Sequence, residues 1–114
     1  TTASSTGAVK LHTLQISATG TAITNHISVA STSVDFVSIA TSTCTQQTET
    51  SSGLTGAATG DIVIATPATG IEAGLTWNSW VSAANQVTIR VCNVGGTNPL
   101  DPAARAWRIT VIKY

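Results

Sequence analysis

The chain has 114 residues, and its five Lys and Arg side chains balance five Asp and Glu side chains, so the formal net charge is zero. Charged residues make up 9% of the chain, whereas Thr (21), Ala (16) and Ser (12) are abundant. A neutral chain without a basic stripe is not expected to bind nucleic acid or an anionic membrane, and 42% apolar residues argue against disorder.

The first half of the chain predicts short strands separated by turns. We expect strands over three short apolar blocks, residues 9–17, 23–29 and 34–39. A polar edge strand is expected over residues 44–50, because Thr favours strands, and a loop over residues 53–60. Residues 1–8 are small and polar, and we interpret them as an N-terminal arm of one domain that spans residues 1–114.

The second half carries the clearest strand pattern. Residues 61–65 are apolar on both faces, which predicts a central strand. Further strands are expected over residues 75–83, 87–94 and 107–114, with a tight turn at 83–86. In residues 87–94, Val87, Ile89 and Val91 share one face, which is the period of a strand. Residues 101–105 predict a single helical turn with Asp101 as its N-cap.

Short strands at this spacing, with no internal repeat, are typical of an all-β domain. The fold predicted from the sequence is therefore an antiparallel β-sandwich or jelly roll of about eight short strands.

The two cysteines, Cys44 and Cys92, are too few for a disulfide-stapled scaffold. They lie 48 residues apart, which does not resemble the spacing of a metal site. Two interpretations stay open: a single disulfide between strands, or two packed thiols.

The sequence contains no motif that points to an enzyme. No nucleophile elbow, phosphate-binding loop or zinc-protease motif is present. His12 and His26 have no obvious partners by spacing, and the carboxylates are isolated along the chain. We therefore predict a non-enzymatic protein without a metal or other cofactor.

Trp77 and Trp80 lie three residues apart in a predicted strand, so they point to opposite faces. Both rings can be covered only if both faces of the strand are covered, and Trp is enriched at protein interfaces. We predict that Trp77 or Trp80, together with Val81, forms a subunit interface.

From residue 27 to residue 114, the chain resembles a small β-domain of tailed-bacteriophage and prophage virion proteins. The resemblance rests on strand ends and turns: VDFVSIA from Val34, GDIVI from Gly60, GIEAGLTW from Gly70, VSAANQVTIRVCNV from Val81, and DPAARAWRITV from Asp101. Members of this group look like capsid decoration (cement) proteins or distal fibre domains, and are often trimeric β-sandwiches without enzymatic activity.

The resemblance implies a capsid decoration protein that binds the outer shell of the virion as a homotrimer, after assembly in the host cytoplasm. No collagen-like stalk or long coiled coil is present, which favours decoration over a fibre. The partner would be the major capsid protein, contacted by the N-terminal residues Thr1, Thr2, Ala3, Ser4 and Ser5.

The alternative is a trimeric module at a fibre tip that binds a receptor or a host-surface carbohydrate. In that case an exposed Trp beside an Arg would stack on a sugar ring.

Overall fold

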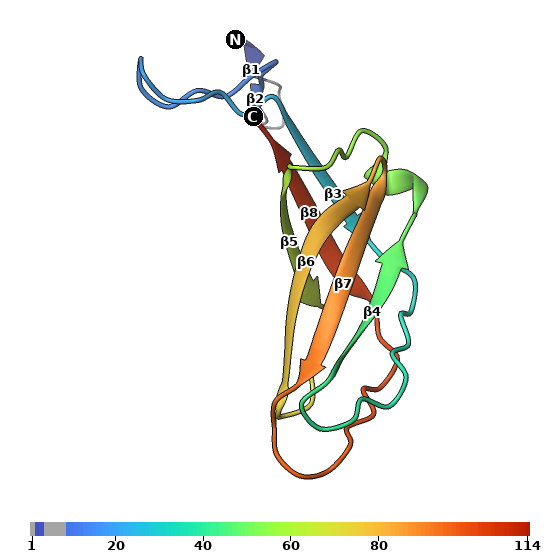
Figure 1. Cartoon of the computed structure of the whole chain (residues 1–114). Coiled ribbons are helices and arrows are strands. Elements are labelled where there is room, and N and C mark those ends of the chain that lie inside the picture. Colours follow the sequence, from blue (N-terminus) through green and yellow to red (C-terminus); the bar gives the residue numbers. More distant parts are fainter. Residues whose placement is uncertain (1, 4–8) are drawn as a thin grey trace.

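A computed structural model of the chain describes residues 2–3 and 9–114 and gives an all-β architecture (Figure 1). Six strands form the body: β3 (Asn25–Ala30), β4 (Cys44–Glu49), β5 (Ile62–Pro67), β6 (Leu75–Ala83), β7 (Gln86–Asn93) and β8 (Trp107–Lys113). They form two antiparallel three-stranded sheets, in the orders β3-β8-β5 and β4-β7-β6. The two-residue strands β1 (Thr2–Ala3) and β2 (Val9–Lys10) pair with each other, and one 3₁₀ turn, η1, spans Ser52–Leu54.

The two sheets are linked by one long antiparallel ribbon. Strand β3 pairs with β8, and β4 pairs with β7. Between these ladders the same two chain segments stay in register through the isolated bridges Val34–Arg105 and Ile39–Leu100. The predicted strand over residues 34–39 is therefore wrong as a sheet strand, because this part of the ribbon crosses from one sheet to the other.

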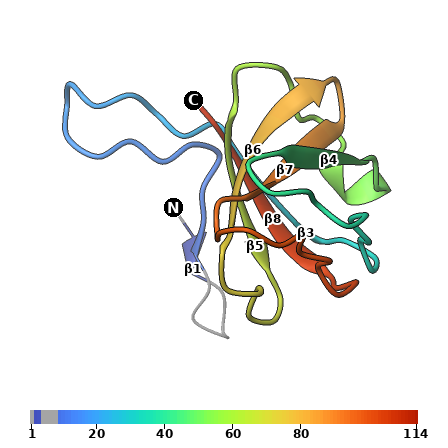
Figure 2. The same cartoon turned by 60° about the horizontal axis from the view of Figure 1, so that its bottom comes forward.

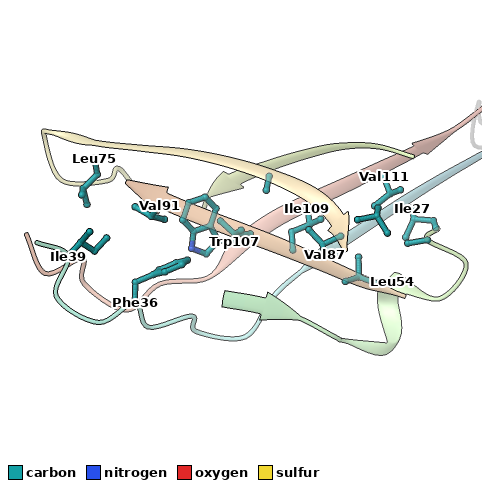
Figure 3. Packing of buried hydrophobic residues seen from close by; sticks show 14 residues of the cluster. Ile27, Phe36, Ile39, Leu54, Leu75, Val87, Val91, Trp107, Ile109 and Val111 are labelled. Carbon is teal, nitrogen blue, oxygen red and sulfur yellow. The ribbon is translucent and has the colours of Figure 1, made fainter. Parts of the chain in front are cut away.

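The strands pack their alternate residues into a common core between the sheets (Figure 3). Val87, Ile89 and Val91 of β7 face Trp107, Ile109 and Val111 of β8, and all six side chains are buried. The Trp107 ring makes edge-to-face contacts with Phe36 and Trp77, at centroid distances of 6.1 and 5.8 Å. The period-2 pattern predicted for β7 is confirmed.

Strands β5 and β6 are the sheet edges opposite the ribbon. The Trp77 side chain spans the gap between them, since its indole nitrogen donates a hydrogen bond to the carbonyl of Ala65 at 2.8 Å. The prediction of a central strand at residues 61–65 is wrong, because β8 is the central strand of that sheet. The predicted edge strand at residues 44–50 is confirmed as β4.

Two other predictions are wrong. Residues 101–105 are not helical, because Arg105 is held extended by backbone hydrogen bonds with Val34. Residues 9–17 contain only the short strand β2 and a single bridge from Leu14 to Ile23.

Residues 11–24 extend away from the body as a long open loop, which we call the protruding segment (Figures 1 and 2). The Cα radius of gyration is 17.2 Å and the longest dimension is 55 Å. A compact domain of this length has a radius of gyration of about 13 Å. The body is elongated along its strands, and the protruding segment and the β1–β2 pair extend the molecule further (Figure 1). Within the described residues, no helix has the length and hydropathy needed to span a membrane.

Candidate functional site

The outer face of the β3-β8-β5 sheet combines exposed isoleucines with small and hydroxyl side chains, and carries almost no charge. Strand register places three cross-strand rows on it: His26, Ile112 and Ile62; Ser28, Thr110 and Ile64; and Ala30, Arg108 and Thr66. We call these nine residues the isoleucine face. Ile62 and Ile64 are 46% and 56% exposed, so two large apolar side chains of β5 lie in solvent.

Three polar side chains of the isoleucine face bond to one another. The hydroxyls of Ser28 and Thr110 share a hydrogen bond of 3.0 Å, and Nε2 of His26 lies 3.1 Å from the same Ser28 hydroxyl. Hydroxyls that already have a protein partner lose less when a covering surface removes water. The isoleucine face is therefore well suited to burial against protein.

The outer face of the other sheet is polar. Cross-strand register brings Gln46, Arg90 and Asn78 into one row and Thr48, Thr88 and Trp80 into the next. The Arg90 guanidinium lies 4.9 Å from the centre of the Trp80 ring, and the hydroxyls of Thr48 and Thr88 are 3.1 Å apart. This geometry gives a cation–π contact beside amide side chains. We call these six residues the polar face.

Cys44 and Cys92 are directly opposite each other in the β4–β7 ladder and form a disulfide. The bond lies at one end of the polar face, next to Thr76. Of the two interpretations left open by the sequence, the structure has the disulfide. The disulfide links the two segments of the long ribbon within the second sheet, where they are strands β4 and β7.

The predicted interface residues lie in three different environments. Trp77 and Trp80 do point to opposite faces: Trp77 contacts Trp107 and the β5 backbone, while Trp80 lies on the polar face. Val81 is only 3% exposed and belongs to the core, so it has almost no surface to offer a partner.

Of the predicted capsid-contacting residues, Thr1, Ser4 and Ser5 lie outside the described residues, as do the other positions between 4 and 8. Thr2 and Ala3 form strand β1, which pairs with Lys10 and Val9. The capsid contact of this segment stays a prediction.

Two of the five carboxylates are held in ion pairs. Asp61 lies 2.6 Å from the Lys113 ammonium, and Glu72 lies 2.5 Å from the Arg105 guanidinium. The hydrogen bond from Lys113 lowers the pKa of Asp61. For Glu72, the backbone N–H of Ala103 is the largest cause of a lowered pKa, with Arg105 adding to it. Both carboxylates are thus stabilised in the ionised form and hold a loop to a neighbouring segment. A general acid requires the opposite, a raised pKa.

His12 is exposed in the protruding segment, and His26 lies on the isoleucine face. Among the residues that the structure describes, no group of three or more His, Cys, Asp or Glu side chains is placed to hold a metal ion.

Sequence reasoning missed Asn93, a buried polar residue that organises the loops at one end of the body. Its amide nitrogen donates to the carbonyls of Ile39 and Asn98, both at 3.0 Å, and its amide oxygen accepts from the N–H of Gly95 at 3.1 Å. The available signal was an Asn at the end of an alternating strand, just before the Gly95-Gly96 pair.

Comparison of the chain with family models, with curated proteins and with solved structures finds no match. Its surfaces are therefore the evidence on its function.

Proposed function

We propose that this chain is a non-enzymatic capsid decoration protein that binds the outer shell of a phage virion as a homotrimer. The observation that carries the proposal is the isoleucine face, on which Ile62 and Ile64 lie exposed in a surface with the single charge of Arg108. An exposed apolar patch on a folded domain marks an interaction site.

The proposal includes a β-sandwich of jelly-roll type. Its support is the winding of the long ribbon, since β3 and β4 run beside β8 and β7 through both sheets. The sheet orders β3-β8-β5 and β4-β7-β6 follow the same winding. A jelly roll of eight strands has one further strand per sheet, which would lie beside β5 and β6.

A decoration protein acts by thermodynamic linkage. A partner that binds only the assembled shell stabilises that shell by RT ln(1 + [L]/Kd), which is about 2.7 kcal/mol at a hundredfold excess over Kd. Such a protein needs a rigid body and broad contact surfaces, and it needs no reactive site. The neutral, hydroxyl-rich composition is favourable for this role, because small uncharged side chains lose little conformational entropy on burial.

The direct test uses phage particles whose genome lacks the gene for this chain. Purified protein is added to these particles, and co-sedimentation and heat resistance are measured. We expect binding at a copy number divisible by three and a higher temperature of DNA release. Absence of co-sedimentation under conditions where the protein is folded would contradict the proposal.

The second candidate is a fibre-tip module that binds host-surface carbohydrate, and the observation that favours it is the Trp80–Arg90 contact on the polar face. The Arg90 guanidinium lies over the Trp80 ring. Gln46 and Asn78 lie on either side of Arg90, in the row next to Trp80. An aromatic ring next to amide groups can stack on a sugar and bond its hydroxyls. A glycan-array signal that is lost in Trp80→Ala and kept in Tyr114→Ala, the control for an exposed aromatic residue elsewhere, would favour this function.

A further inference from the structure

We propose that the protruding segment, residues 11–24, packs on the isoleucine face of a second copy of this chain. The inference rests on the self-association part of the proposed function and names the two surfaces that meet. It does not depend on which shell or receptor the assembly binds.

The protruding segment buries very little of itself. Leu11, Leu14 and Ile16 are 50%, 45% and 76% exposed. Its two halves are joined by one bridge, with hydrogen bonds of 3.1 and 2.7 Å between Leu14 and Ile23. An isolated two-stranded hairpin is marginally stable in water. Three exposed apolar side chains on such a segment therefore call for a covering surface.

The segment is directed away from its own body. The N–H of Thr24 donates to the carbonyl of Lys113 at 2.8 Å, which continues the β3–β8 ladder to the base of the segment. Beyond this point the segment turns to the side and extends away from the sheets (Figures 1 and 2). In this position the segment leaves Ile62 and Ile64 of its own isoleucine face in solvent.

The two surfaces match in size. From residue 11 to the turn at residue 17 the segment reaches about 23 Å, and a six-residue strand such as β5 is about 20 Å long, both at roughly 3.3 Å per residue. The isoleucine face also has relief, because the small residues Ser28 and Ala30 leave a shallow hollow beside Arg108. On the same face, Ile62 and Ile64 of β5 are exposed beside Ile112 and Thr110 of β8.

The two surfaces also match in charge. Residues 11–34 contain no Asp, Glu, Lys or Arg. The only charged residue of the isoleucine face, Arg108, lies in the row farthest from the protruding segment. Covering one neutral surface with the other therefore desolvates few charges. An open groove of about 650 Å³ between the base of the segment and the first row of the face, lined in part by Leu11, Leu14 and Ile112, makes the two surfaces continuous.

A contact between a segment of one copy and a different surface of the next is heterologous. Contacts of this kind close into rings when the rotation between copies permits. Each copy then gives one segment and receives one, so both apolar surfaces are covered at once. This arrangement is compatible with a trimer and provides a physical route to it.

The first test compares full-length charge variants by analytical ultracentrifugation. Leu14→Lys and Ile64→Lys alter the two surfaces separately, and Val94→Lys alters an exposed valine outside both. We expect the first two variants to weaken self-association by about a hundredfold, since each replaces a buried apolar side chain by a charge, while Val94→Lys assembles as the unmodified chain does. Tryptophan fluorescence verifies that each variant is folded.

The second test requires no loss of assembly. A Leu14→Cys variant and a differently tagged Ile64→Cys variant are mixed and treated with a short bifunctional maleimide. Because Cys44 and Cys92 are already joined, only the new thiols react. We expect a crosslink between the two tagged chains, and little crosslinking when Val94→Cys replaces Ile64→Cys.

Equal crosslinking to both positions, or unchanged assembly in both lysine variants, would overturn the inference. These outcomes are separate from capsid binding. Assembly through the two surfaces by a protein that binds no capsid supports the inference while it refutes the proposed function.

Discussion

At the scale of single residues, Gly74 and Gly95 bring two loops closer together than any side chain would allow. A Cβ atom built on Gly95 would lie 2.5 Å from the Cα of Gly74. The adjacent residue Val94 donates its N–H to the carbonyl of Gly74 at 2.8 Å, and Asn93 holds the same loop through its amide. The end of the body therefore depends on backbone packing with little side-chain volume.

The Gly95→Ala substitution is expected to destabilise the chain by about 1–3 kcal/mol, because the added methyl group overpacks a backbone contact. Gly70→Ala is the matched control, since a Cβ there meets nothing within 4 Å and its φ is not positive. We expect that variant to change the free energy of unfolding by less than about 1 kcal/mol. Urea denaturation measures both, and equal effects of the two substitutions would contradict the packing argument.

The ion pairs of Asp61 and Glu72 predict a loss of stability in acid. The pKa of each carboxyl is lowered in the folded state, so between the folded and unfolded pKa values the unfolded chain binds more protons. The stabilisation is therefore fully present above the unfolded values, about 4, and is lost as the pH falls through the lowered folded values.

Urea denaturation at a series of pH values between 7 and 2 checks this prediction. The slope of unfolding free energy against pH in the acid range should be smaller in Asp61→Asn and Glu72→Gln than in the unmodified chain. Asp101→Asn, which alters an exposed carboxylate outside both ion pairs, is the control for a change of net charge. Identical slopes in all four proteins would refute the role of the ion pairs.

At the scale of elements, the long ribbon determines the fold. Its two segments are paired from residues 25 and 113 to residues 49 and 87, through both sheets and the crossing between them, with shifts of register between the ladders. The paired residues of the ribbon are far apart in sequence, so bringing them together on folding costs chain entropy. The disulfide between Cys44 and Cys92 reduces this cost, because it already restricts the unfolded chain.

Reduction of the disulfide is expected to lower the free energy of unfolding by about 2–4 kcal/mol, given the 48-residue separation of the two cysteines. Denaturation with and without reductant measures the effect. A Cys44→Ser, Cys92→Ser double variant should resemble the reduced chain and be insensitive to reductant. A reducing environment would keep the pair as thiols, so the disulfide requires oxidising conditions. An unchanged denaturation midpoint on reduction would refute this role.

The elements that sequence reasoning predicted well are those whose burial follows a simple period. The predicted bounds of β6, β7 and β8 agree with the structure to within a residue, and along β7 and most of β8 inward apolar residues alternate with outward polar ones. The prediction for β5 is wrong because its residues are apolar on both faces. A buried central strand has this pattern, and so does an edge strand whose outer apolar face is exposed. The strand expected over residues 9–17 has the same ambiguity. Its apolar residues Leu11, Leu14 and Ile16 lie exposed on the protruding segment.

Local patterns also could not reveal the long-range contacts. The buried residues Phe36 and Ile39 suggested a strand, but they lie where the ribbon crosses between the sheets. Asp101 and Pro102 suggested a helix start, but the pairing of Arg105 with Val34 and Glu72 keeps that segment extended. Each of these outcomes depends on a partner that is distant in sequence.

At the scale of the whole molecule, the exposed apolar side chains lie on surfaces that carry almost no charge. Two ion pairs already neutralise two of the five acidic and two of the five basic side chains. The isoleucine face and the protruding segment are both largely free of charge, and each leaves large apolar side chains in solvent. Exposed apolar patches mark interaction sites, and a surface with little charge promotes association.

The central claim is that this chain assembles with itself, and the most direct test is the molar mass of the intact protein by light scattering across a range of concentrations. We predict a mass three times the 11.6 kDa of one chain, which persists on dilution. A mass of 11.6 kDa at every concentration would contradict the account.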